Sequence, residues 1–374
     1  MLTPYDELLC HQVSTTFDHV QQSDLRWTER IVLYGFDTAS GKINFMTGLA
    51  RYPNRNVMDA YGMVTLDNET AHVVRLSREL RPETGDLNQF IVGPYTYEII
   101  QPLMKVRAAL GENKYGLSFD LEFEGTFPAY EQAPAFFRSR GRVSEDARRF
   151  YQSGRMSGWF KLNGKTIEVN KAKWMVGRDH SWGTRRGGGG GSVPEGSFLQ
   201  PPEIPEGVLY FMGIFHFKKW MVHFAQREDS QGKRWHFEGG IYYPLGSKKE
   251  KEEVPVLTVE HDFKFRPDLR VIESGRVITT AADGSRKEIS IRPVTRFWPG
   301  LAGYDYYNDY MSGMWKGPFY MDGFTADITD LNVLQKVSML TETLCEVHCG
   351  REVGYGLVEM VFLGKYPRYG YTGY

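Results

Sequence analysis

Apolar and polar residues alternate along most of the chain with a period of two, which is typical of strands with one buried and one wet face. In residues 117–123, Leu and Phe alternate with Ser, Asp and Glu. Asn163-Gly164 and Asp283-Gly284 separate such runs, and an Asn-Gly pair accepts the positive φ of a type I′ hairpin turn. Few long helical patterns occur, and residues 329–345 are compatible with one helix. The pattern therefore predicts a mainly β, antiparallel protein.

A change in composition near the middle of the chain indicates two domains. Residues 184–207 are rich in glycine and proline and include five consecutive glycines at 187–191. The glycine run is compatible with a native loop and with an engineered insertion. Because a set of strand-like runs lies on either side, we predict two β-barrel or sandwich domains, residues 1–195 and 196–374.

Composition excludes several classes of protein. The chain has 374 residues, of which 41% are hydrophobic and 24% charged, as in a globular protein. The net charge is -1 and no long basic run occurs, so nucleic-acid binding is not expected. No apolar run reaches the roughly 18 residues of a membrane helix, and the N-terminus lacks a signal-peptide pattern. With only three cysteines, we expect a cytoplasmic protein without a disulfide framework.

No cofactor or metal is expected. Cys345, His348 and Cys349 offer fewer ligands than a structural zinc site requires. The glycines at 187–191 lack the strand-turn-helix context of a phosphate-binding loop. The sequence is compatible with a homodimer but does not fix the oligomeric state.

Residues 174–186 concentrate the candidate chemistry. In an extended conformation, alternate side chains share a face. An aromatic face with placed basic groups suits the wall of an apolar ligand cavity, although core tryptophans and a paired arginine would give the same pattern. The first face would carry Trp174, Val176, Arg178, His180 and Trp182, and the second Met175, Gly177, Asp179 and Ser181.

Two blocks carry a resemblance to a known family. Residues 177–183, Gly-Arg-Asp-His-Ser-Trp-Gly, resemble the signature of the carotenoid 1,2-hydratase/AttH-like group. A poorly characterised bacterial branch of this superfamily resembles the chain most, because it carries the same motif and a block similar to residues 52–61. The resemblance implies two lipocalin-like barrels in tandem, with relatives that include hydratases of prenyl double bonds and fungal lipocalin-like Diels–Alderases. It points to His180 and Trp182, and to Tyr210 as the tyrosine of a Tyr-x-Asp pair. Met212 stands where that pair has its aspartate.

The function we expect is a cofactor-independent lyase, of hydratase or dehydratase type, or an isomerase. Its substrate would be a terpenoid, steroid-like or aromatic molecule, and a tuned acid in a dry aromatic cavity would transfer the proton. We assign His180 as the main acid/base, tuned by Asp179 and Arg178. The rival assignment makes Asp179 the acid. A non-catalytic carrier of a hydrophobic ligand and a pericyclase are the alternatives.

The expected site is completed by residues from outside the central stretch. Trp174, Trp182, Tyr210 and Phe215 would wall a single cavity. Polar contacts to the substrate would come from Arg178, Arg185, Asn56 and Asp59. The block that contains Asn56 and Asp59 is also compatible with a plain turn.

Overall fold

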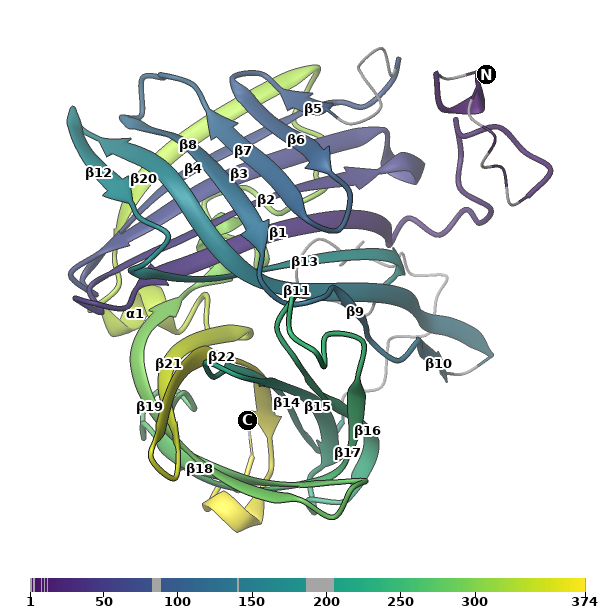
Figure 1. Cartoon of the computed structure of the whole chain (residues 1–374). Helices are drawn as coiled ribbons and strands as arrows, with labels where there is room; N and C mark the ends of the chain where they lie inside the picture. Colours follow the sequence, from purple (N-terminus) through teal and green to yellow (C-terminus); the bar gives the residue numbers. More distant parts are fainter. Residues whose placement is uncertain are drawn as a thin grey trace.

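The computed structural model has the mainly β, tandem lipocalin-like architecture that the sequence predicts, with a curled sheet above a closed barrel (Figure 1). It describes residues 2, 4–7, 9, 11, 13–82, 89–139, 141–185 and 205–373. The glycine run at 187–191 lies outside the described residues.

The first sheet has 14 strands within the described part of the chain and curls around an apolar interior. Its path runs β20-β4-β3-β2-β1-β13-β11-β8-β7-β6-β5, with β9, β10 and β12 paired to β11. Its strands from the first half of the chain are β1 (Trp27–Asp37), β2 (Ile43–Tyr52), β3 (Val57–Leu66), β4 (Thr70–Glu79), β5 (Gln89–Val92), β6 (Tyr95–Gln101), β7 (Lys105–Leu110), β8 (Leu117–Gly125), β9 (Tyr130–Glu131), β10 (Ala135–Ser139), β11 (Arg142–Leu162), β12 (Lys165–Val169) and β13 (Trp174–Thr184).

The second body is a closed antiparallel barrel, seen along its opening in Figure 1. Its strands are β14 (Gly207–His216), β15 (Met221–Asp229), β16 (Arg234–Tyr242), β17 (Glu253–Phe265), β18 (Ile272–Ala281), β19 (Arg286–Phe297), β21 (Thr341–Cys349) and β22 (Glu352–Gly364). Short 3₁₀ segments occur at Pro4–Glu7, Pro53–Arg55, Pro299–Ala302 and Pro367–Tyr369.

Local turn and helix signals had different outcomes. Asn163 and Gly164 join β11 to β12 with φ values of 48° and 85°, which confirms the predicted hairpin. The helix expected within 329–345 shrinks to α1 (Leu331–Leu334), capped by Asp330. From Thr341 onward the chain pairs with β19 and β22 instead, because its alternating apolar residues fill both the barrel and the interface between the two bodies.

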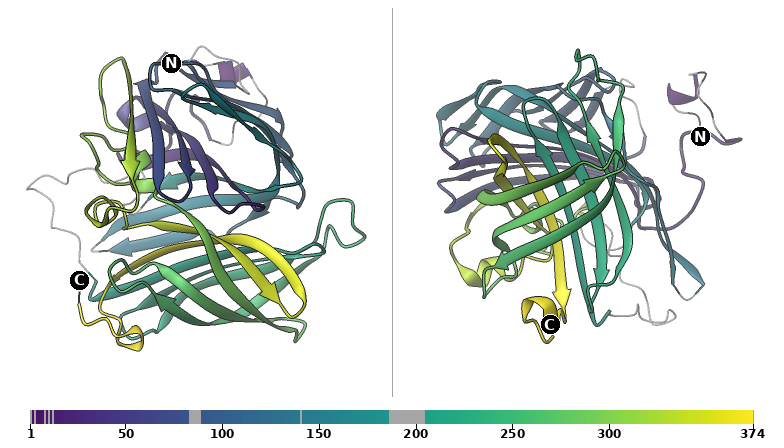
Figure 2. Two further views of the ribbon diagram at one scale, coloured as in Figure 1. Left: turned by 90° about the vertical axis from the view of Figure 1, so that its left-hand side faces the viewer. Right: turned by 60° about the horizontal axis from the view of Figure 1, so that its bottom comes forward.

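One strand from the second half of the chain belongs to the first sheet. β20 (Phe319–Asp327) pairs with β4 along its whole length. In the left view of Figure 2 this strand, drawn in light green, runs along the edge of the first sheet toward the barrel. The division at residues 195 and 196 stays a prediction, and residues 319–327 cross it.

Three apolar cores follow from this arrangement. One fills the curled sheet, one fills the barrel, and one lies between the two bodies. β13 borders two of these cores, because Trp174 and Val176 point into the first sheet and Met175 points into the interface. No helix among the described residues is long and apolar enough to cross a membrane.

Candidate functional site

β13 lies between β1 and β11 and presents different chemistry on its two faces. Asp179 is directly opposite Val32 of β1 and Tyr151 of β11, whereas His180 is opposite Ile31 and Phe150. Because neighbouring side chains on a strand point to opposite faces, the central motif contributes to two separate places. The inner face is the concave side of the first sheet, and the outer face looks toward the barrel.

On the inner face, Arg178 is held inside the first sheet. Its Nε and Nη2 both donate to Oε1 of Gln152, at 3.0 and 2.7 Å. Its guanidinium also lies over the rings of Phe123 and Phe150. The hydrogen bonds of the Arg178 guanidinium therefore go to Gln152, and the structure shows no contact between it and His180, the residue that it was expected to tune.

His180 has a carboxylate partner, but that partner is Glu29 of β1. Nε2 of His180 lies 3.0 Å from Oε1 of Glu29, and the imidazole packs edge-on against Trp182 and Phe150. Burial raises the pKa of Glu29, but His180 and Arg51 overcome this effect and hold it below its usual value. The expectation that Asp179 sets the charge of His180 is wrong, because the two residues face opposite ways.

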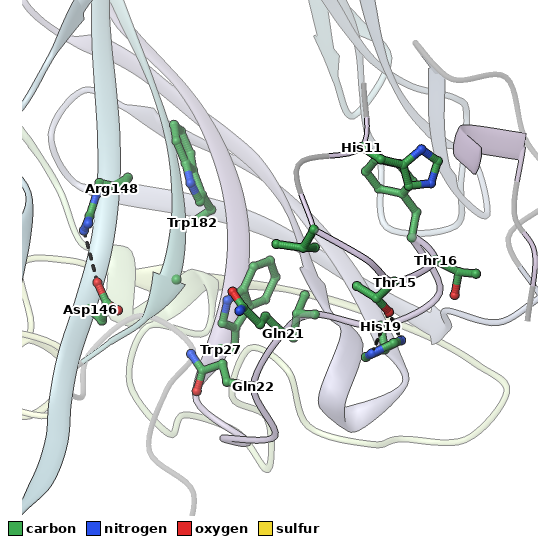
Figure 3. Close-up of a pocket in the computed structure, with 14 residues that line it drawn as sticks. His11, Thr15, Thr16, His19, Gln21, Gln22, Trp27, Asp146, Arg148 and Trp182 are labelled. Atoms are coloured by element: carbon green, nitrogen blue, oxygen red, sulfur yellow. Dashed lines mark hydrogen bonds and ion pairs between the residues drawn. The ribbon is translucent and has the colours of Figure 1, made fainter. Parts of the chain in front are cut away.

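Trp182 lines a pocket of about 420 Å³ at the rim of the first sheet (Figure 3). Trp27 and Trp182 stand on the sheet side, and His11 and His19 stand on the N-terminal arm. The further lining residues are Val13, Thr15, Thr16, Phe17, Val20, Gln21, Gln22, Asp146, Arg148 and Gly183. His180 is not among the lining residues and meets the pocket only through its contact with Trp182.

The second sequence block fastens the arm that forms this pocket. Nδ2 of Asn54 donates to the carbonyl oxygens of Gln22 and Asp24, both at 2.9 Å. Nε of Arg55 donates to the carbonyl oxygen of Leu25 at 2.6 Å. These bonds fix the chain just before Trp27, so the block positions one wall of the pocket.

The two residues of this block that were expected to contact substrate have different surroundings. Asn56 adopts a left-handed turn with φ 57°, and its Oδ1 accepts the backbone N–H of Arg81 at 3.0 Å. Asp59 is 4% exposed and accepts the backbone N–H of Gly313 at 2.6 Å. Burial raises the pKa of Asp59 to about 6, against the attraction of Arg30. Asn56 thus has the role of a turn residue, and Asp59 belongs to the outer face.

The outer face of the first sheet carries a group of polar side chains on the side that is turned toward the barrel. Oδ2 of Asp179 lies 3.6 Å from Nε of Arg149, and solvent reaches 12% and 24% of these two side chains. The Tyr151 hydroxyl accepts from Nη1 of Arg149 at 3.1 Å. Tyr34 lies over Gly177, where a side chain would collide with its ring. The glycine of the motif therefore makes room for a tyrosine.

The barrel adds two glutamates to this group. Glu342 of β21 and Glu359 of β22 are direct cross-strand partners, and Glu342 is 5% exposed. Met212 of β14 lies opposite Glu359 on its other side, and the hydroxyl of Tyr210 interacts with Glu359. We call Asp179, Arg149, Glu342, Glu359 and Tyr210 the interface cluster.

The two glutamates of the interface cluster retain protons more strongly than ordinary carboxyls. Burial raises the pKa of Glu342 well above its usual value, and the neighbouring Glu359 and Asp179 raise it further. Burial also raises the pKa of Glu359, against the attraction of Arg149. Because adjacent carboxyls with little access to water resist ionising together, the pair keeps a proton to higher pH than a single exposed glutamate would.

The structure separates the residues that were expected to wall one cavity. Trp174 fills the core of the first sheet, Phe215 fills the core of the barrel, and Trp182 lines the rim pocket. The single cavity predicted from them is therefore wrong. Tyr210 belongs to the interface cluster, and Arg185 lies within electrostatic reach of Arg149 and Asp179.

Sequence reasoning missed three members of the interface cluster. Glu359 had a usable signal, since it is the only charged residue in the run from Gly356 to Leu363. Glu342 and Arg149 sit in ordinary alternating strands, where a charged residue usually faces water. Their burial follows from the packing of the barrel on the first sheet, which no local pattern reports.

Cys345 and His348 each have a hydrogen-bond partner within their own strand, β21. Sγ of Cys345 donates to the carbonyl oxygen of Thr343 at 3.4 Å, and Nε2 of His348 lies 2.8 Å from Oε1 of Glu346. Across the described ranges, no group of three or more His, Cys, Asp or Glu side chains is arranged to hold a metal ion.

A family model described as "Family of unknown function (DUF8625)" matches residues 2–372. The chain belongs to this family. A comparison with curated proteins gives no match.

Solved structures share the fold at low sequence identity. An AttH candidate from Nitrosomonas europaea has a TM-score of 0.55 at 10% identity, covering 91% of this chain and 93% of that one. CghA, solved with Sch210972, has a TM-score of 0.52 at 10% identity, covering 91% and 89%. Kievitone hydratase from Nectria haematococca has a TM-score of 0.45 at 12% identity, covering 90% and 89%. The first two similarities confirm the expected fold and leave the motif resemblance as a prediction.

Proposed function

We propose that this protein is a cofactor-independent lyase of hydratase or dehydratase type, or an isomerase, acting on an apolar small molecule. The observation that carries the proposal is the cross-strand pair of Glu342, which is buried, and Glu359, which is half-buried, within the electrostatic influence of Asp179 and Arg149. Strongly perturbed carboxyls that share a site with an ion pair and tyrosines are typical of acid–base centres.

The pair can supply the acid, and Asp179 the base, of a hydration reaction. The protonated carboxyl of Glu342 or Glu359 gives its proton to one alkene carbon, and the π electrons form the new C–H bond. Water adds to the cationic neighbour carbon and loses a proton to Asp179, which is ion-paired with Arg149. Dehydration is the reverse reaction. In an isomerase, the acid would protonate one alkene carbon and the base would remove a proton from another carbon next to the cation, so that the double bond moves.

Aromatic rings around the interface cluster suit a cationic intermediate. The side chains of Tyr34 and Tyr151 lie on the outer face of the first sheet, and Tyr210 faces them from the barrel. Ring faces attract positive charge, most strongly where water is excluded. We therefore place the proton transfer at the interface cluster, in preference to His180 on the inner face.

The test combines a substrate-free measurement with turnover. Infrared spectra at pH 7 should show a protonated-carboxyl band that weakens in Glu342→Gln and Glu359→Gln. A panel of terpenoid, steroid-like and aromatic alkenes and alcohols, incubated in H₂¹⁸O or D₂O, should yield labelled product by mass spectrometry. Each variant should lower that rate by about 10²–10⁴, the range for a lost acid.

Glu288→Gln is the matched control, because Glu288 is an exposed glutamate of the same barrel. It should keep wild-type turnover. Full activity in both Glu342→Gln and Glu359→Gln would refute the proposal and favour a pericyclase, whose rate depends on the shape of the site more than on an acid.

A ligand carrier is the second candidate, and the rim pocket favours it. Trp27 and Trp182 give that pocket of about 420 Å³ two indole walls, without a buried acid among its lining residues. A carrier would quench tryptophan fluorescence on binding an apolar ligand, release the ligand unchanged, and lose the quenching in Trp182→Ala.

A further inference from the structure

Two arginines near the interface cluster, the buried Arg30 and the half-buried Arg185, have buried N–H groups without acceptors. Arg30 is 3% exposed, and its Nη2 donates to the Tyr52 hydroxyl at 3.1 Å while Nη1 has no partner. Arg185 has two buried donors without partners, Nε and Nη2. An unpaired buried N–H of a charged group costs roughly 1–3 kcal/mol or more, so such groups are seldom left without a purpose.

The register places Arg30 on the face that the interface cluster occupies, and Arg185 directly follows β13, the strand that carries Asp179. Arg30 of β1 and Arg149 of β11 are both direct cross-strand partners of Ser181. Arg30 also lies 4.4 Å from the ring centre of Tyr304. Burial lowers the pKa of Arg185, and the positive charges of Arg149 and Arg30 add to this effect, which brings the pKa to about 10.

Positive charge is in excess in this region. Arg149 is paired with Asp179, and the raised pKa values of Glu342 and Glu359 favour their neutral forms. The pKa of the nearby Asp59 is also raised, to about 6. Its carboxyl accepts hydrogen bonds from the backbone N–H of Gly313 and the hydroxyl of Tyr310. No carboxylate of the described chain is hydrogen bonded to the free N–H groups of Arg30 or Arg185. An anionic group from outside the chain would complete them.

We propose that the substrate is an apolar acid, carrying a carboxylate or an acidic enol oxygen, which Arg185 binds with the help of Arg30. This inference rests on the proposed function, because it takes the interface cluster as the reacting centre. Guanidinium N–H groups recognise planar anionic oxygens strongly, and an anion held there would anchor the apolar part against the tyrosines. Acid–base chemistry at Glu342 and Glu359 would then occur at a carbon a short distance from the acidic group.

The test is binding of matched ligand pairs to the full chain. Isothermal titration compares a panel of arylalkanoic acids, such as 2-naphthylacetate, with the corresponding primary amides, which have nearly the same shape without the charge. The wild type should bind at least one acid about 10- to 100-fold more tightly than its amide, the range for a charge-assisted hydrogen bond. Arg185→Gln should abolish that preference, Arg30→Gln should reduce it, and the exposed-arginine control Arg286→Gln should keep it.

A stability measurement distinguishes a ligand-binding arginine from a structural one. Without ligand, Arg185→Leu should melt at the wild-type temperature or higher, because it removes an unpaired buried charge. A marked fall in melting temperature would show that Arg185 serves the fold and would overturn the inference, as would an acid preference that is absent from the wild type or survives Arg185→Gln.

The outcomes separate this inference from the proposed function. Loss of turnover in Glu359→Gln without any acid preference would sustain the lyase and refute the anion site. Acid preference that depends on Arg185, with full turnover in Glu342→Gln and Glu359→Gln, would sustain the anion site and refute the proton source.

Discussion

At the scale of single residues, the central feature is that neighbours in the motif serve different sites. Asp179 faces Arg149 and the barrel, while His180 faces Glu29 and the interior of the first sheet. A sequence motif on a strand therefore need not describe one constellation. Its consecutive residues reach two chemically distinct spaces, because the strand lies between these spaces and its side chains alternate between them.

This separation gives a prediction for the two neighbours. Asp179→Asn should lower turnover by about 10²–10⁴, because the amide cannot accept the proton that water releases. His180→Ala should lower it far less, since the imidazole is outside the interface cluster. The measurement is kcat for both variants on the same substrate, with circular dichroism as a check of folding. A larger loss in His180→Ala would return the acid/base role to the histidine.

At the scale of elements, β20 ties the second half of the chain to the first sheet through one buried arginine. Arg75 of β4 is 0% exposed and is the direct cross-strand partner of Asp322 in β20. Both oxygens of Asp322 accept from Arg75, and the arginine also donates to the carbonyl oxygens of Tyr307 and Asn308. The segment that precedes β20 is thus held by the same side chain.

Asp322→Ala should therefore be strongly destabilising. It leaves a fully buried guanidinium without its carboxylate, a change that typically costs about 3–5 kcal/mol. Asp262→Ala is the matched control, because the Arg276–Asp262 pair is 54% and 68% exposed and should contribute about 0–1 kcal/mol. Urea unfolding gives both free energies, and a loss below about 1 kcal/mol for Asp322→Ala would contradict the role of β20 as a tie.

The same elements show what the sequence could and could not predict. Asn163-Gly164 set its hairpin by local backbone preference, and the alternation in β13 correctly placed Trp174 and Met175 on different faces. Pairing between distant strands has no such local signal. The contact of Glu29 with His180, and that of Glu342 with Glu359, depend on which strands become neighbours, so the candidate site emerged only from the assembled fold.

At the scale of the whole molecule, the two bodies share a continuous apolar interface that contains buried acids. Tyr34 and Met175 of the first sheet pack in the same cluster as Leu344 and Leu357 of the barrel. With β20 added, we expect the chain to unfold as one cooperative unit. Acids with raised pKa lie in or beside this interface, so the pH dependence of stability should report on it.

The sign follows from the folded pKa values. Asp59 titrates at about 6 and Glu238 at about 7 in the folded chain, because burial raises both pKa values above those of exposed carboxyls. The folded state then holds protons that the unfolded state has released, so each group's stabilisation is complete below its unfolded pKa of roughly 4 and is lost as pH rises through its folded pKa. Glu29 and Glu228, whose pKa values are lowered, act in the opposite sense and lose their stabilisation at lower pH.

The carboxyls with raised pKa values contribute a fall in the free energy of unfolding as pH rises from about 4.5 to about 7. The buried His216 and His223, whose pKa values burial lowers to about 3, contribute a rise over the same range, so the carboxyl contribution is measured as a difference between variants. Asp59→Asn should flatten this fall, since the amide oxygen can still accept the backbone N–H of Gly313 without ever becoming charged. Glu238→Gln should flatten its upper part, and Glu288→Gln, an exposed control, should leave the wild-type slope. Urea unfolding at half-unit steps of pH measures all four proteins. An Asp59→Asn slope equal to that of wild type would show that the Asp59 carboxyl is already ionised in the folded chain at these pH values, contrary to the pKa that its burial raises.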